Sequence, residues 1–414
     1  MAGRHIGPQA QRILIGMPSI RTRLMIGAAS ALLAGGVAWI AFARIRSGRE
    51  TLTLFDDSGA ALELLVQRQA SASRGLLDPA ITTQSAGLVR ETIDPETAAR
   101  LFAIGREHFT YDPFTIYRYR GGQKIRVEFP EHERGYFVKN TSREGFGESF
   151  EELAAKRDRL IVVSGDSHTD GLCDTEETFS QRLEVALRGR HPELVIEVLN
   201  TGVSGYSFYN YLGALEKLLP EKPDAFVVAF YGGNDFLDVL KPWHYFQHTA
   251  PPPRRADYRQ MLERAKQASG MAVANAFNQL LYFQYHPDQV ELALTAAEQV
   301  CAEIQRLCKA HGIALSFVYI PPGFDVDGAL KPAFARAKEA LGLADSDLRQ
   351  FHRLADSLIG VLNQSGASVI DLRERFPGDI DDYYWDDLHI NVKGHQAVAD
   401  LLLPRIEEQC FRAR

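Results

Sequence analysis

Beyond residue 156, short apolar runs alternate with longer amphipathic stretches. The runs are as short and as continuously apolar as strands buried on both faces of a parallel sheet, and they lie at 160–164, 194–199, 225–230, 313–320 and 368–372. Between them, apolar residues recur at helical spacing, first at Phe179, Leu183 and Leu187 (with Asp174 or Thr175 as the expected cap) and then within 256–283, 288–310 and 348–364. Five strands alternating with helices predict an α/β domain with an open parallel sheet covered on both faces.

A long uncharged run stands near the start of the chain. Residues 24–43, "LMIGAASALLAGGVAWIAFA", carry no charge, and about 20 apolar residues are the length that crosses a bilayer. We expect a single-pass transmembrane signal anchor, with residues 1–23 as a cytoplasmic arm and the catalytic domain on the periplasmic or extracellular side. The competing interpretation is a secreted protein cleaved near Ala43, because Ala41-Phe42-Ala43 has the A-x-A form of a cleavage site.

The region 44–155 lacks a clear period. Residues 51–68 alternate weakly around an Asp-Asp-Ser-Gly turn, which suggests a hairpin. Asp94 followed by Pro95 is a typical helix start. Residues 110–150 are rich in Tyr, Arg, Gly and Phe, which suggests short strands or a lid. We therefore expect a lead-in or stalk region with short strands at 44–155, followed by the main domain at 156–410.

Composition limits the partners and cofactors. The formal net charge is -7 and no long basic block occurs, which argues against nucleic acid as a partner. The four cysteines include no C-x-x-C pair, which argues against a zinc knuckle. Cys301 and Cys308 share the apolar face of an expected helix and are interpreted as core residues. We expect no cofactor and no metal.

Polar blocks follow the expected strands, at the sheet edge where open α/β folds bind ligands. "GDSHT" at 165–169 follows the first strand, "NTGVSGY" at 200–206 the second and "YGGND" at 231–235 the third. "DDLHIN" at 386–391 comes one loop after the fifth strand. If the sheet is as expected, all four blocks converge on one edge.

Together these blocks hold the groups that acyl transfer needs. Ser167 is the candidate nucleophile, and a serine hydroxyl needs a base at neutral pH. His389 can be that base, and Asp386, three residues earlier, can orient its ring. The candidate donors of an oxyanion hole are the N–H of Ser167, the N–H of Gly202 and the side-chain amide of Asn234. Possible substrate contacts are His168, Tyr206 and Trp385.

The four blocks, in this order, resemble the SGNH (GDSL-type) hydrolase superfamily, whose name corresponds here to Ser167, Gly202, Asn234 and His389. The resemblance covers roughly residues 156–406. It implies a flavodoxin-like three-layer α/β/α sandwich with a five-stranded parallel sheet, and metal-independent esterase or lipase chemistry. The segment 198–207 followed by 222–235 also looks like membrane-anchored or exported bacterial members, which often occur with exopolysaccharide or cell-envelope pathways. His168 departs from the family pattern, in which leucine often follows Gly-Asp-Ser.

Alternatives remain at several positions. His168 and His395 are rival bases, although a ring adjacent to the nucleophile points elsewhere in most backbones, and His395 falls at the start of the last expected helix. Asp387 competes with its neighbour for the orienting role. Two further carboxylates are interpreted as hydrogen-bonding supports of their own loops, those of Asp166 and Asp235.

The sequence thus predicts a serine esterase that hydrolyses an O-acetyl or O-acyl ester on a glycan or glycolipid through an acyl-serine intermediate. Its expected partners are an acylated glycan or lipid-like ester substrate and, through residues 24–43, the membrane. An O-acyltransferase with the same Ser-His-Asp site is the first alternative. A non-catalytic envelope scaffold or glycan-binding subunit is the second.

Overall fold

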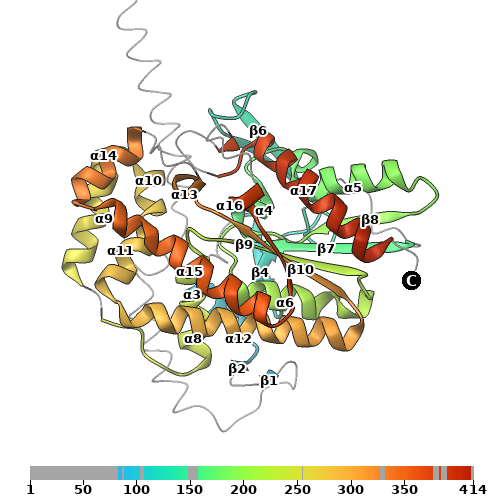
Figure 1. Ribbon diagram of the computed structural model, residues 1–414, viewed down its shortest axis with the longest axis horizontal. Coiled ribbons are helices and arrows are strands. Elements are labelled where there is room, and N and C mark those ends of the chain that lie inside the picture. The colour runs from blue at the N-terminus through green and yellow to red at the C-terminus, as the bar shows by residue number, and fades with distance from the viewer. Residues whose placement is uncertain are drawn as a thin grey trace, which may run out of the picture. The chain divides into compact units, whose positions relative to one another are not determined.

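A five-stranded parallel sheet forms the centre of the computed structural model, which describes residues 83–85, 88–102, 107–147, 157–253, 255–326, 332–375, 382–383 and 389–411. All of them belong to one compact unit, Thr51–Arg414. The spatial order of the strands is β11-β10-β9-β7-β8 (Figure 1). Their bounds are Arg159–Gly165 for β7, Ile196–Asn200 for β8, Ala225–Tyr231 for β9, Ala314–Ile320 for β10 and Ser368–Asp371 for β11. When the strands are numbered within the sheet, this is the order 2-1-3-4-5 of flavodoxin-like folds. The expected α/β fold of the main domain, with its five-stranded parallel sheet, is confirmed.

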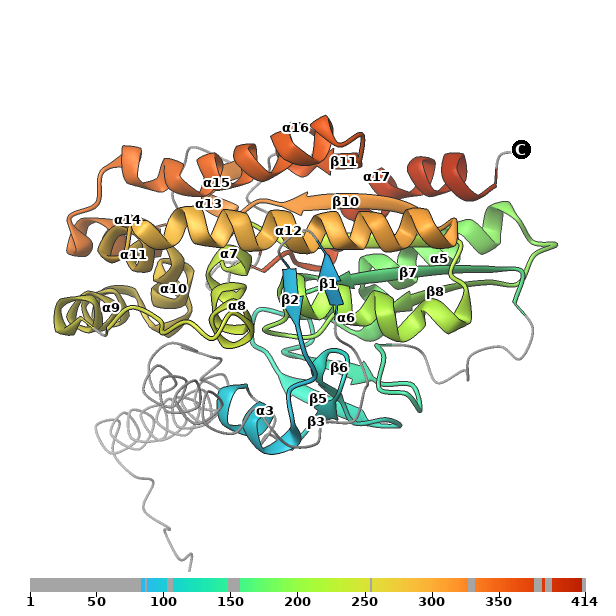
Figure 2. The same cartoon turned by 90° about the horizontal axis from the view of Figure 1, so that it is seen from below.

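Helices cover both faces of this sheet because its strands present apolar side chains on both sides (Figure 2). On one face Ile161, Val163 and Val227 pack against α5 (Phe179–Arg190) and α17 (Val392–Cys410). On the other face lie α6 (Phe208–Leu218), α12 (Asp288–His311) and α15 (Asp345–Gln364). The buried thiols Cys301 and Cys308 are part of that second core, as the sequence predicts.

In the long excursion between β9 and β10, the regular secondary structure of the described residues is helical. It contains α7 (Asp235–Asp238), α8 (Leu240–Phe246), α9 (Ala256–Ser269), α10 (Met271–Ala276), α11 (Asn278–Tyr285) and α12. With α14 (Pro332–Leu341), helices α9 to α11 build a small apolar core of their own. Short helical turns complete the domain: α4 (Ser167–Asp170), η1 (Thr175–Glu177), η2 (Leu219–Glu221), α13 (Gly323–Val326) and α16 (Leu372–Arg375).

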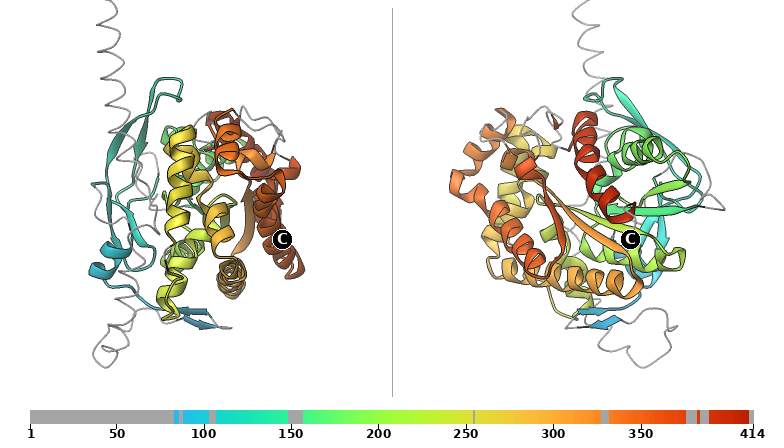
Figure 3. Two further views of the ribbon diagram at one scale, coloured as in Figure 1. Left: turned by 90° about the vertical axis from the view of Figure 1, so that its left-hand side faces the viewer. Right: turned by 45° about the vertical axis from the view of Figure 1, so that its right-hand side comes forward.

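Three antiparallel strand pairs precede the sheet. They are β1 (Thr83–Ser85) with β2 (Leu88–Arg90), β3 (Phe109–Asp112) with β4 (Ile116–Tyr119), and β5 (Lys124–Glu128) with β6 (Tyr136–Asn140). Figure 3 shows β3 to β6 lying together as a layer beside the helices. Between the pairs, α3 (Pro95–Leu101) begins as expected, with the Asp94 carboxylate accepting from the N–H groups of Glu96 and Thr97 at 3.0 Å.

The sequence misplaced the start of the first sheet helix. Neither Asp174 nor Thr175 caps α5, because these residues begin the separate turn η1, and Thr178 is the capping residue instead. The expected hairpin at 51–68 and the expected membrane segment at 24–43 lie outside the described residues. Among the residues that the structure does describe, no helix combines the length and the apolar character that a membrane span requires.

Candidate active site

Ser167 stands at the carboxyl end of β7, at the first position of α4. Asp166 caps this turn, with its Oδ1 accepting from the His168 N–H at 2.9 Å. A Cβ atom on Gly165 would lie 2.0 Å from Thr169 Oγ1 and 2.6 Å from the carbonyl oxygen of Ala229. Only glycine therefore lets the turn fold back so closely onto the sheet, and this places the serine at the sheet's edge.

His389 is brought to Ser167 from the far end of the sequence. Its Nε2 lies 2.7 Å from Ser167 Oγ, a hydrogen-bond distance suited to a base and its nucleophile. The segment that carries it is closed by a bridge between Tyr383 and Ile390 and by the Asn391 N–H, which donates to the Asp382 carbonyl at 2.8 Å. The pairing of blocks 222 residues apart follows the sequence prediction.

The predicted orienting acid Asp386, its rival Asp387 and the predicted substrate contact Trp385 lie outside the described residues. His395, the rival base, is buried on α17, where its Nδ1 accepts from the Phe179 N–H at 3.2 Å. Its ring also stacks on Phe179. His395 is therefore a packing residue, as its position in the sequence suggested.

Asp166 is a buried carboxylate directly beside the nucleophile. Burial raises its pKa to about 6, against the opposing effects of the hydrogen bond from His168 and of the nearby His389. Its Oδ2 lies 3.4 Å from Ser167 Oγ. The short bond to the His168 N–H confirms the predicted role within its own turn.

Asn234 caps α7 at the end of β9. Its Nδ2 donates to Asp238 Oδ2 at 2.5 Å, and an amide NH₂ has a second hydrogen to offer. Burial raises the pKa of Asp238 to about 7. Asp235 supports the same loop, since its Oδ2 accepts from the Tyr231 N–H at 2.9 Å and the Tyr211 hydroxyl at 2.8 Å. Asp238 carried no signal in the sequence, because one turn of helix separates it from the recognisable block.

Gly202 does not offer a free donor in this structure. Its N–H donates to Asn200 Oδ1 at 2.9 Å, and a Cβ on it would lie 2.7 Å from the Asp170 nitrogen. Its small size thus serves close packing against α4. On the same loop Gly205 has a φ of +81°, which favours glycine. Among the described residues, the N–H groups of Ser167 and Gly205 make no intramolecular hydrogen bond.

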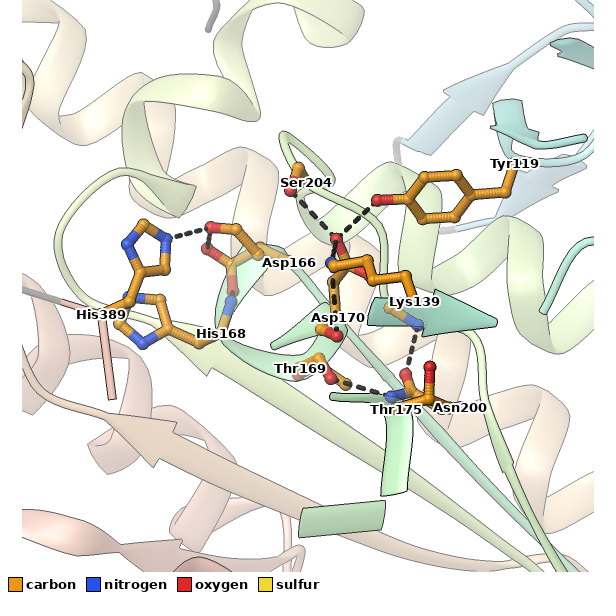
Figure 4. Close-up of polar contacts among 12 residues, drawn as sticks. Tyr119, Lys139, Asp166, His168, Thr169, Asp170, Thr175, Asn200, Ser204 and His389 are labelled. Carbon is orange, nitrogen blue, oxygen red and sulfur yellow. Dashed lines mark hydrogen bonds and ion pairs between the residues drawn. The ribbon is translucent and has the colours of Figure 1, made fainter. Parts of the chain in front are cut away.

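Two predicted substrate contacts are instead interior residues. Tyr206 is 1% exposed, its ring packs edge-on against Tyr117, and its hydroxyl donates to the Tyr117 carbonyl. His168 is also 1% exposed, and its ring lies against that of His389 (Figure 4). The sequence could not show either position, because both contacts depend on segments far away in the chain.

The lead-in strands hold the loops around the nucleophile. The Asp170 carboxylate at the end of α4 accepts from the Tyr119 hydroxyl at 2.8 Å and the Ser204 hydroxyl at 3.1 Å, and it pairs with the Lys139 ammonium (Figure 4). The Tyr117 hydroxyl donates to the Ser204 carbonyl at 3.0 Å. Strands β4 and β6 are therefore a fixed support of the site. From the sequence alone, this region could have been either short strands or a lid.

One group of possible metal ligands exists among the described residues, His132, Asp174 and Glu177, with ligand atoms within 4.8 Å of one another. Each already has a protein partner. His132 Nε2 lies 3.0 Å from Glu177 Oε2, and Asp174 Oδ1 accepts from the Val138 N–H at 2.7 Å. We interpret the group as the attachment of the β5–β6 hairpin to η1.

Comparison with known proteins identifies the domain. Residues 163–352 match the model of the GDSL-like Lipase/Acylhydrolase family. A comparison with curated proteins found no match. The solved structures similar to this chain include an acetylxylan esterase from Geobacillus stearothermophilus, with 16% identity and a TM-score of 0.37 over 63% of this chain and 100% of that chain. They also include a second acetyl xylan esterase, with 16% identity and a TM-score of 0.35 over 60% and 99%.

The family match and the site geometry agree on the first three blocks. The matched residues contain Ser167 and Asn234, whereas His389 lies beyond them and is assigned from its contact with the serine. Residues 163–352 thus match the GDSL-like lipase/acylhydrolase family, and this match supports an esterase.

Proposed function

We propose that this esterase works through an acyl-serine intermediate, with Ser167 as the nucleophile and His389 as the general base. The observation that carries the proposal is the 2.7 Å contact between His389 Nε2 and Ser167 Oγ. A serine hydroxyl becomes an effective nucleophile when a positioned imidazole takes its proton. The proposed orienting acid is Asp386, as the sequence spacing suggests.

The reaction proceeds in two acyl transfers. Ser167 Oγ attacks the ester carbonyl carbon while its proton passes to His389 Nε2, which gives a tetrahedral oxyanion. Collapse breaks the bond to the alcohol oxygen, and His389 returns the proton to that oxygen. Water then attacks the acyl-serine, again losing a proton to His389, and the second collapse releases the carboxylic acid and restores the serine.

The oxyanion needs donors that are not already used. We propose the Ser167 N–H, the Gly205 N–H and the second amide hydrogen of Asn234, with Gly205 in place of the Gly202 expected from the sequence. The support is the engaged N–H of Gly202 and the absence of an intramolecular bond from the N–H of Gly205 among the described residues. Preorganised donors of this kind are each worth about 10²–10³ in kcat.

Hydrolysis of p-nitrophenyl acetate tests the nucleophile and base. The wild-type enzyme should release p-nitrophenol, and Ser167→Ala and His389→Ala should each lose at least about 10³-fold in kcat. His395→Leu is the control, because it removes a buried imidazole whose Nδ1 accepts from the Phe179 N–H. Full activity of Ser167→Ala would exclude an acyl-Ser167 intermediate.

For the natural substrate we propose an O-acylated glycan or glycolipid outside the cytoplasmic membrane, with residues 24–43 as the anchor. The support is the apolar run at 24–43 and the resemblance of the sequence to exported family members. Release of acetate from O-acetylated polysaccharides, compared with release from short-chain glycerides, tests the substrate class. An alkaline phosphatase fusion after residue 50 should be active, and an inactive fusion would contradict the orientation.

A further inference from the structure

The residue after the nucleophile lies directly under the candidate base. The ring centroids of His168 and His389 are 4.4 Å apart with an interplanar angle of 24° (Figure 4). The Tyr231 ring lies 3.9 Å from His168 at 31°. Two rings cannot share one face of an imidazole at such separations, so His168 lies between Tyr231 and His389. The stack joins the ends of β7 and β9 to the segment that carries the base.

A second contact fixes the same segment. The N–H of Ile390, the residue that follows His389, points to His168 Nδ1 at 3.5 Å. His168 is itself fixed, because its own N–H donates to Asp166 and it is 1% exposed. The Tyr231 ring beneath it fills the space that a side chain at Gly233 would need, since a Cβ there would lie 2.3 Å from that ring. His168 is thus a rigid surface, and His389 rests on it.

The electrostatics of the stack disfavour a positive charge on His168. Burial, and then the neighbouring His389 and His395, lower the pKa of His168 well below its usual value. The other titratable groups facing it are Asp166, bonded to its N–H, and Tyr231. An imidazolium at His389 therefore lies over a neutral aromatic ring, an arrangement that stabilises cations.

We propose that His168 is the positioning residue of the catalytic base: its ring is the surface that holds the His389 imidazole with Nε2 directed at Ser167. The proposal rests on the role of His389 in the proposed function. It explains why the position after the serine holds a flat side chain with an acceptor nitrogen, and it assigns Tyr231 as the support of the stack.

The test is the pH dependence of Ser167 phosphonylation by a fluorophosphonate, which reports activation of the nucleophile without knowledge of the natural substrate. The full chain, purified in mild detergent, is compared with His168→Leu, which removes the flat ring, and His168→Phe, which keeps it. His395→Leu is the matched control for loss of a buried imidazole. Hydrolysis of p-nitrophenyl acetate then separates kcat from KM.

His168→Leu should slow phosphonylation and lower kcat by about 10- to 100-fold with KM little changed, because the base is misplaced. The acid limb of its pH profile should move about half a unit to one unit lower, since the imidazolium loses its aromatic neighbour. In His168→Phe the phosphonylation rate and kcat should stay within about 3-fold of the wild type, and the acid limb of the pH profile should not move. His395→Leu should leave the phosphonylation rate and the acid limb unchanged.

A wild-type rate and acid limb in His168→Leu, or the same shift in His395→Leu, would overturn the proposal. If His168→Leu does not fold, Tyr231→Leu with Tyr231→Phe as its conservative partner tests the same stack from below, and equal profiles for these two variants would overturn it. Phosphonylation of the Ser167→Ala variant at the wild-type rate marks the separate failure of the proposed function.

Discussion

Replacing Lys139 with methionine should destabilise the fold through one buried ion pair. Lys139 and Asp170 are each 7% exposed, and their ammonium and carboxylate groups are in contact. Methionine keeps much of the length but leaves the carboxylate in the interior, where its side-chain donors among the described residues are the Tyr119 and Ser204 hydroxyls. Removing one partner of a buried pair costs about 3–5 kcal/mol, because the remaining charge is uncompensated.

Urea unfolding followed by tryptophan fluorescence measures the effect on Lys139→Met, Asp170→Asn and the double variant. The free energy of unfolding of the double variant should fall by clearly less than the sum of the decreases in the two single variants, with a coupling free energy of about 2 kcal/mol. Arg126→Met is the matched control, since its ion pair with Glu128 in the same hairpin is exposed, and it should leave the unfolding midpoint unchanged. If Lys139→Met keeps the wild-type stability and the losses of the two single variants add up in the double variant, this pair does not hold the lead-in strands to the site.

Four further predictions concern three residues around the site. Asp238→Leu should lower kcat about 10-fold because the Asn234 amide loses its partner, whereas Asp238→Asn keeps an acceptor and should retain activity. Because burial raises the pKa of Asp238 to about 7, its contribution to stability is lost as pH rises toward 7, so Asp238→Asn should gain stability relative to the wild type between pH 4 and pH 8 in urea unfolding. Burial lowers the pKa of His395 to about 3, so wild-type stability should be lost as pH falls from about 6.5, and His395→Leu should reduce that slope. Gly202→Ala should lose phosphonylation of Ser167, since its Cβ would lie 2.7 Å from the Asp170 nitrogen, while Gly189→Ala, with open space around it, should keep full labelling.

The sheet and the Ser–His pair could be predicted from the sequence because both follow from local patterns. Strands buried on both faces are continuous apolar runs, and the residues after parallel strands share one edge. Ser167 and His389 are therefore found by their positions after strands, although most of the chain separates them. The same rule placed Asn234 at this edge.

The remaining features depend on side-chain contacts that no local pattern encodes. Asn200 engages the N–H of Gly202, so a glycine in the expected block is a packing residue. Tyr206 points inward because Tyr117 of a lead-in strand accepts its hydroxyl. The ring of His168 lies against the base and not in the solvent, since Tyr231 supports it from another strand. Such contacts join segments of unrelated periodicity, and only the folded chain shows them.

Peptide mapping by mass spectrometry after fluorophosphonate treatment of the full chain tests the central claim most directly. The proposed acyl-enzyme mechanism predicts a single phosphonyl adduct on Ser167, which disappears in Ser167→Ala and forms at least about 10³-fold more slowly in His389→Ala. An adduct on another residue, or labelling of Ser167 that is independent of His389, would contradict it.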